Sequence, residues 1–185
     1  EVRQGQENYI LSKDTLEMLR EEPFQIVKEF LGETLVGKVF IPHYDFYKIE
    51  PGKKAFQVFG GDFVTAEEGT GIVTIAAYGQ EDLALMLKEN IQIVLHLDEE
   101  GKIKSEVPKF AGRYFLDADP LIIEDLKSRN LIYRVDSYTH SVPHCWRCHE
   151  RLIYSPQNAW YVNIQKLKPQ MKVTNESVNW FPEHF

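Results

Sequence analysis

The sequence has few cysteines, no long hydrophobic run and no excess of basic residues. Two cysteines in 185 residues are too few for a disulfide scaffold, which favours a reducing compartment. No window approaches the apolar length that crosses a bilayer, and the N-terminal residues resemble neither a signal peptide nor a transit sequence. These absences predict a cytoplasmic protein without a membrane partner, and we expect a monomer.

Basic residues are outnumbered, because 21 Lys and Arg face 28 Asp and Glu and leave a net charge of −7. A protein that holds nucleic acid on a broad surface needs clustered Lys and Arg, so we expect any contact with RNA to be local. The sequence begins with Glu1 rather than Met, which favours a piece of a longer polypeptide.

Apolar residues are abundant enough for a core, at 43% of the sequence. A hydrophobic period near that of a helix predicts helices at residues 13–20, with Ser12 as N-cap, and at 80–90 and 118–130. Alternation and short apolar runs predict strands at residues 9–11, 24–30, 55–58, 63–64, 71–76, 91–97, 131–137 and 160–164. The sequence therefore predicts a β-rich α+β fold.

The composition changes near residue 138. Residues 140–149 contain three His, two Cys, a Pro, a Trp and an Arg, which predicts a knuckle rather than a core element. Residues 165–185 are predicted to be a polar exit segment. We therefore divide the chain into a first domain at residues 1–138 and a return segment at residues 139–185.

Four ordered blocks of sequence stand out along the chain. The first is DFVT at residues 62–65, followed by GTGIV at 69–73. The second comprises EVP, AGRY and DAD at residues 106–108, 111–114 and 117–119. The third comprises YTHS, PHCWRC and LIY at residues 138–141, 143–148 and 152–154, and the last is VNWFPEH at 178–184. Together these blocks resemble the editing insertion of the isoleucyl-tRNA synthetases, a class I family.

The resemblance implies a β-barrel-like editing domain, the connective peptide 1 insertion, with a few helices and a zinc-knuckle-like return segment. Its expected activity is hydrolysis of mischarged Val-tRNA(Ile), in which water attacks the aminoacyl ester. The expected partners are the acceptor end of tRNA(Ile), the valine moiety and the rest of the synthetase chain. ATP and Mg are expected only in the parent catalytic domain, because the sequence has no ATP-binding signature and no Gly-rich phosphate loop.

Asp82 is the residue that the resemblance matches to the editing aspartate, if the loop before it is one residue shorter than usual. A fixed carboxylate can hold the α-ammonium of the aminoacyl ester and so orient its carbonyl. Alternatively, Glu81 and Asp82 only complement a helix N-terminus. Thr74 replaces the family's usual His, and Ala77 its Pro. A threonine can orient water or a ribose hydroxyl, but it cannot act as a base near neutral pH.

Gly69, Thr70 and Gly71 are candidate substrate-binding residues, because glycines let an RNA end approach the backbone closely. Glycines are equally typical of a bend in a barrel strand. The threonine-rich segment that forms the opposite wall of the pocket in the family is missing from the sequence. We therefore expect the chain alone to be a poor hydrolase.

Cys145 and Cys148 have the C-x-x-C spacing of half a tetrahedral zinc site. The resemblance implies that the other half lies elsewhere in the parent enzyme, so zinc is expected in the parent and not in this chain. His140, His144 and His149 are substitute ligands or ordinary polar loop residues. A redox role is disfavoured, because no thioredoxin-like strand and helix flank the pair.

Two other functions stay open. The first is a non-catalytic insertion, structural or binding the tRNA acceptor end, whose editing site has degenerated. Thr74, the shortened loop and the missing threonine wall motivate it. The second is a free-standing zinc-ribbon adaptor, which needs two more ligands than the C-x-x-C pair provides.

Overall fold

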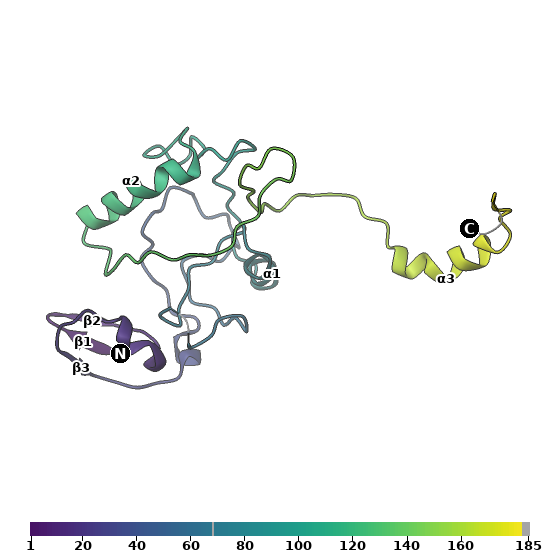
Figure 1. Ribbon diagram of the computed structural model, residues 1–185. Coiled ribbons are helices and arrows are strands. Elements are labelled where there is room, and N and C mark those ends of the chain that lie inside the picture. Colours follow the sequence, from purple (N-terminus) through teal and green to yellow (C-terminus); the bar gives the residue numbers. More distant parts are fainter. Residues whose placement is uncertain (68, 183–185) are drawn as a thin grey trace.

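The computed structural model of the chain describes residues 1–67 and 69–182, so residues 183–184 of the last sequence block lie outside the described residues. Within these ranges, three strands form one antiparallel sheet in the order β2-β1-β3, namely β1 (Val2–Gln4), β2 (Glu7–Tyr9) and β3 (Phe24–Ile26). The same ranges contain the 3₁₀ helices η1 (Lys13–Met18) and η2 (Gly32–Leu35) and the α-helices α1 (Gln80–Glu89), α2 (Phe115–Ser128) and α3 (Ile164–Asn175) (Figure 1). The described chain is therefore a small α+β fold.

The N-terminal sheet is a short hairpin with a third strand on its other side. Val2 of β1 pairs with Tyr9 of β2 and with Ile26 of β3. Val2 and Gln4 are buried and the residue between them is exposed, which is the alternation of a sheet with one covered face. The hydroxyl of Tyr133 donates a 2.5 Å hydrogen bond to Gln4 Oε1. This contact ties the sheet to the segment that follows α2.

The hydrophobic core consists of two clusters. The first packs against α2, and its buried members are Ile103, Val107, Phe110 and Ala118. The second packs against α1, and its buried members are Ala77, Met86 and Ile91. Of the apolar residues of α1, Leu83 and Met86 lie in this cluster, whereas Leu87 is exposed. The second cluster fixes the position of α1 and of its first turn.

The helix ends follow the local sequence signals. Ser12 is the N-cap of η1, because its hydroxyl accepts a 3.2 Å hydrogen bond from the N–H of Asp14. Helix α1 spans nearly the predicted range and ends at Asn90, which adopts the left-handed conformation with φ 56°. Helix α2 begins at Phe115 rather than at the predicted residue 118, with Tyr114 as its N-cap.

Only part of the predicted strand content is present. The predictions at residues 9–11 and 24–30 overlap β2 and β3. The other predictions are wrong for the described residues, which have no strand at 55–58, 63–64, 71–76, 91–97, 131–137 or 160–164. Isolated bridges replace some of them, such as those that join Val39 to Gln57 and Leu97 to Ile103. The observed sheet is open, and a closed barrel stays a prediction.

The absence of a partner backbone explains why residues 71–76 do not form the predicted strand. A strand needs a partner backbone for its N–H and C=O groups. Here the N–H groups find side chains instead: that of Ile72 donates to Thr70 Oγ1 and that of Ala76 donates to Asp82 Oδ2. Ile75 of this run packs against the cluster of α1, whereas Ile72 and Val73 are exposed. The apolar run therefore indicated a partly buried segment but not a paired strand.

The C-terminal arm, residues 155–182, leaves the body of the molecule and carries α3 (Figure 1). Its residues from 157 onward are all exposed. The strand predicted at 160–164 is absent: residues 160–163 have no regular secondary structure, and α3 begins at Ile164. Asn163 caps this helix by accepting a hydrogen bond from the N–H of Lys166 at 3.0 Å. The apolar residues Ile164, Leu167 and Met171 have helical spacing.

The tryptophans lie outside both core clusters. All three, Trp146, Trp160 and Trp180, have exposed side chains. None of the helices in the described residues is long and apolar enough to span a membrane. The division of the chain at residue 138 stays a prediction.

Candidate functional site

A hollow of about 300 Å³ lies at the first turn of α1. It is lined by Phe63, Val64, Thr65, Val73, Thr74 and Asp82. The structure thus brings the two predicted catalytic residues, Thr74 and Asp82, to one cavity. Thr65 adds a second hydroxyl group. The sequence reasoning did not single it out, although it is the last residue of the DFVT block.

The carboxylate of Asp82 is held by the loop that precedes α1. Its Oδ2 accepts a 3.1 Å hydrogen bond from the backbone N–H of Ala76. An acid that only caps a helix accepts from N–H groups of the helix start itself. Asp82 instead reaches back past the N-cap residue, Gly79, so capping alone does not account for its position. Among the described residues, no group hydrogen-bonds its second oxygen, Oδ1.

The charge of the hollow is simple. Among the described residues, Asp82 is the only ionisable one that lines it, and the other lining side chains are two threonines and three apolar residues. Such a site can hold an ammonium group on the carboxylate and a water or sugar hydroxyl on the threonines. The described lining residues include no imidazole or amine that could serve as a general base.

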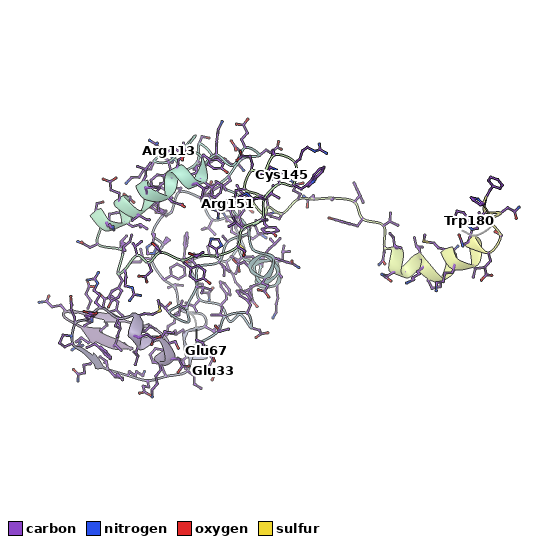
Figure 2. The ribbon with its side chains drawn as sticks, in the orientation of Figure 1. Glu33, Glu67, Arg113, Cys145, Arg151 and Trp180 are labelled. Carbon is purple, nitrogen blue, oxygen red and sulfur yellow. The ribbon has the colours of Figure 1, made fainter. Side chains whose placement is uncertain are left out.

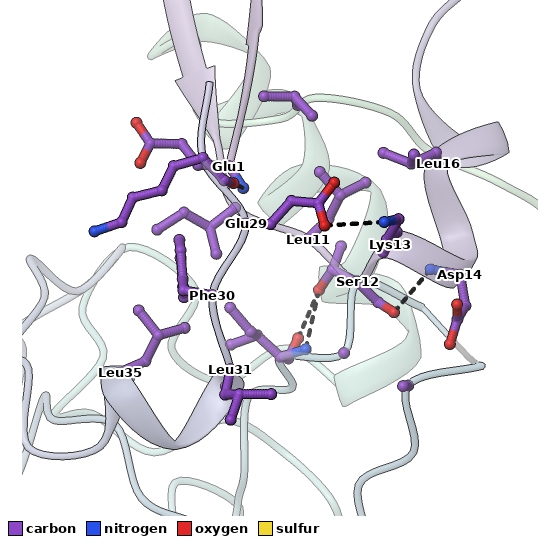
Figure 3. A pocket seen from close by; sticks show the side chains of 18 of the residues that line it. Glu1, Leu11, Ser12, Lys13, Asp14, Leu16, Glu29, Phe30, Leu31 and Leu35 are labelled. Carbon is purple, nitrogen blue, oxygen red and sulfur yellow. Dashed lines mark hydrogen bonds and ion pairs between the residues drawn. The ribbon is translucent and has the colours of Figure 1, made fainter. Parts of the chain in front are cut away.

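A second hollow, of about 660 Å³, adjoins the first, because Val64 and Thr65 line both. Figure 3 shows it between the segment that carries Ser12 and Lys13 and the segment that carries Leu31 and Leu35. A salt bridge of 2.9 Å between Lys13 and Glu29 crosses this cavity. Of the three predicted substrate-binding residues, Thr70 and Gly71 line the second hollow and Gly69 lines neither.

The backbone conformation at residues 69–71 explains why glycine occurs there. Gly69 and Gly71 have φ of +59° and +72°, in the left-handed region that side chains disfavour. The N–H of Ser12 donates a 2.8 Å hydrogen bond to the carbonyl of Thr70, and a Cβ at residue 71 would lie 3.2 Å from Ser12 Cβ. The bend is therefore sufficient to explain both glycines. Their role in substrate binding stays a prediction.

Cys145 begins a tight turn in the upper part of the body, near Arg151 (Figure 2). The N–H of Cys145 donates to the carbonyl of Glu150 and the N–H of His149 donates to the carbonyl of Cys145, each at 2.8 Å. The backbone N–H groups of Cys148 and Arg147, followed by the Cys148 side chain, lower the pKa of Cys145. Both cysteines are free thiols.

The cysteine pair fits half of a zinc site. The lowered pKa of Cys145, caused first by the backbone N–H groups of Cys148 and Arg147, favours the thiolate that a metal needs. The histidines do not supply the other half in the described residues, which contain no cluster of three or more potential ligands. His144 Nδ1 lies 2.8 Å from the carbonyl oxygen of His149, and His140 Nδ1 lies 3.2 Å from that of Ser141.

Comparison with known proteins extends the motif resemblance to the whole chain. No family model matches the sequence. The isoleucine–tRNA ligase of Clostridium novyi (strain NT) is 39% identical over 186 residues, which cover 100% of this chain and 18% of that protein. The enzyme of Clostridium acetobutylicum is 39% identical over 185 residues, with the same coverage. The enzyme of Mycobacterium leprae (strain TN) is 34% identical over 197 residues, again with 100% and 18%.

These relatives define a class of protein, because the similarity runs through the segments that form both hollows and the cysteine turn. Along its whole length the chain matches a segment of an aminoacyl-tRNA synthetase. More specifically, the matching enzymes are isoleucine–tRNA ligases, and the chain spans about 18% of their length. The resemblance seen in the four sequence blocks is thereby confirmed for the family.

Proposed function

We propose that the chain is the editing segment of an isoleucine–tRNA ligase and hydrolyses Val-tRNA(Ile). The observation that carries the proposal is the Asp82 carboxylate, anchored through one oxygen on the N–H of Ala76 at the wall of a small hollow. A carboxylate fixed in this way costs little ordering entropy when it binds an ammonium group. The family membership supports an aminoacyl-tRNA as the substrate.

In the proposed reaction, Oδ1 of Asp82 accepts a hydrogen bond from the α-ammonium of the valyl group. The hydroxyls of Thr65 and Thr74 orient the attacking water or the terminal ribose. The oxygen of water bonds to the ester carbonyl carbon, the bond from that carbon to the ribose oxygen breaks, and the ribose oxygen takes up a proton. Since Asp82 is engaged by the ammonium group and the other described lining residues offer no general base, catalysis in this hollow rests on orientation rather than on proton abstraction by a side chain.

An isoleucine enzyme needs this second step because valine differs from isoleucine by one methylene. That difference is worth only about 1–3 kcal/mol in a binding pocket, a general figure for which this class of synthetase is itself a standard example. Phe63, Val64 and Val73 form the apolar part of the hollow. In the proposal they contact the valine side chain and limit the size of the group that enters.

The remaining partners belong to the same proposal. The chain contacts the acceptor end of tRNA(Ile) locally and packs against the rest of the ligase, whose catalytic domain uses ATP and Mg. Cys145 and Cys148 supply half of a structural zinc site in the parent enzyme, where the metal would hold the turn at residues 145–150 closed. The proposed enzyme is a cytoplasmic monomer with a barrel-like editing domain.

The test is deacylation of Val-tRNA(Ile) by the longest natural polypeptide that contains the chain. Wild type and Asp82→Ala are compared, with Ile-tRNA(Ile) as the control substrate. We expect wild type to release valine and to spare isoleucine, and Asp82→Ala to lose valine release while it still charges tRNA with isoleucine. Equal rates of valine release from wild type and variant would contradict the assignment of Asp82.

A non-catalytic insertion is the second candidate, and the threonine at position 74 favours it, because this hollow lacks the imidazole that the family places there. It predicts that wild type releases no valine and that Asp82→Ala changes at most the stability of the segment. The same deacylation assay therefore separates the two candidates.

A further inference from the structure

Gly79 is a glycine without a backbone reason to be one. Its φ and ψ are −97° and 141°, in the extended region that every residue adopts. It is the N-cap of α1 and makes no side-chain cap, although Ser, Asp or Asn at this position would satisfy an N–H group of the first turn. The requirement for glycine must therefore come from its surroundings.

Those surroundings are the carboxylate of Asp82. A Cβ built on Gly79 would lie 3.0 Å from both Cγ and Oδ2 of Asp82, and 3.4 Å from its Cβ. These are the atoms that the Ala76 N–H holds through its 3.1 Å hydrogen bond. The absence of a side chain at Gly79 thus leaves the space that the Asp82 carboxylate occupies when it accepts the hydrogen bond from the Ala76 N–H.

We propose that Gly79 is a positioning residue for the editing carboxylate, an inference that rests on the proposed function. The missing side chain lets Asp82 Oδ2 reach the Ala76 N–H, and this contact leaves Oδ1 for the α-ammonium of the substrate. A Cβ at residue 79 forces the carboxylate to shift by a few tenths of an ångström. Because the atoms in the way belong to one side chain rather than to backbone, Asp82 can rotate aside and the fold stays intact.

The first arm of the test measures kcat/KM for deacylation of Val-tRNA(Ile). Displacement of a reacting or orienting group by up to an ångström costs about 10- to 100-fold, so we expect Gly79→Ala to lose at least about 10-fold without a change in Tm. Gly60→Ala is the matched control, because its new Cβ meets only Val36 Cγ2 at an ordinary 3.8 Å. It should behave as wild type.

A double-mutant cycle shows whether Gly79 acts through Asp82. If it does, adding Gly79→Ala to Asp82→Ala causes no further loss of activity. An independent further loss in the double variant, or full activity in Gly79→Ala, would overturn the proposal.

The second arm does not depend on activity. In NMR spectra of the wild-type chain, the Ala76 amide resonance should shift when Asp82→Ala removes its hydrogen-bond acceptor. We expect Gly79→Ala to lose most of this response and Gly60→Ala to keep it. A response unchanged in Gly79→Ala overturns the positioning role even where no valine is released, whereas a lost response without deacylation in wild type refutes only the editing function.

Discussion

Two aspartates on two helices differ in how many of their hydrogen-bonding sites the protein uses. Asp125, near the end of α2, is almost wholly buried and accepts from Lys109, from the hydroxyl of Tyr44 at 2.7 Å and from Arg129 at 2.8 Å. Asp82, at the start of α1, is half-buried and accepts a single hydrogen bond from the described residues, that of Ala76. Both oxygens of the first carboxylate have partners, whereas one oxygen of the second has none among the described residues.

The difference separates a structural carboxylate from a candidate functional one. The contact with Lys109, followed by those with Tyr44 and Arg129, lowers the pKa of Asp125 to about 2. Tyr44 joins α2 to a loop far away in the sequence, whereas Lys109 and Arg129 lie close to the two ends of the helix. A buried carboxylate with partners on both oxygens has little capacity left for a ligand, whereas an anchored one with a free oxygen is prepared to bind a cation. Each prediction below tests this division of roles.

The largest effect is expected for Asp82→Asn. The amide keeps an oxygen for the Ala76 N–H but loses the negative charge that holds the α-ammonium. A hydrogen bond to a charged group contributes about 1.5–3 kcal/mol, so deacylation of Val-tRNA(Ile) should fall by about 10- to 100-fold. Tm, measured by circular dichroism, should stay within a degree or two of wild type. A large fall in Tm with intact deacylation would reverse the comparison.

Asp125→Asn is expected to show the opposite profile. It leaves Lys109 and Arg129 without their shared counter-charge, so Tm should fall by several degrees while deacylation of Val-tRNA(Ile) at a permissive temperature stays near that of wild type. Asp119→Asn is the matched control, because Asp119 is an exposed aspartate of the same helix. An equal loss of Tm in both variants would remove the special role of Asp125.

The contribution of Asp125 to stability should depend on pH in the acid range. The pKa of Asp125 is lowered from 3.8 to about 2 in the folded protein, so the unfolded chain takes up the proton first as the pH falls. The stabilisation is complete above pH 4 and is lost progressively as the pH falls toward 2. Urea unfolding at a series of pH values should therefore show a steeper acid loss for wild type than for Asp125→Asn. Parallel curves would contradict the prediction.

The smallest effect is expected at His96, outside both aspartate sites. Burial, followed by the charge of Lys104, lowers the pKa of His96, whose Nδ1 lies 3.5 Å from the hydroxyl of Tyr78. The unfolded chain thus gains the proton first, and stability should decrease modestly as the pH falls below 6.5. In His96→Gln this part of the pH dependence should disappear from the urea midpoints. If the urea midpoints of His96→Gln depend on pH as those of wild type do, the pH dependence comes from other groups.

The sequence predicted the helices near the site better than the sheet. Helix α1 was found because its apolar spacing, its first-turn acids and Asn90 at its end all agree, and these are local signals. The strand at 71–76 was not found as predicted, because pairing depends on which backbone lies alongside. Helix α3 was missed, since Lys residues and Pro169 diluted its apolar spacing.

The site was predictable only in part, for a related reason. Asp82 and Thr74 could be proposed from the family motif, and the structure brings them to one hollow. Whether Asp82 caps its helix or reaches past it depends on the path of residues 76–79, which no local pattern specifies. The role of Gly79 was invisible in the sequence, because its reason is a neighbouring side chain and not a turn.

The positions of the tryptophans have a practical consequence for spectroscopy. Because Trp146, Trp160 and Trp180 all face solvent in the folded chain, their emission should already be red-shifted and open to quenching by acrylamide or iodide. Intrinsic fluorescence will consequently be a weak indicator of unfolding for this polypeptide. The same property makes it a sensitive reporter of association: a blue shift and loss of quenching would mark the moment at which another surface covers the C-terminal arm.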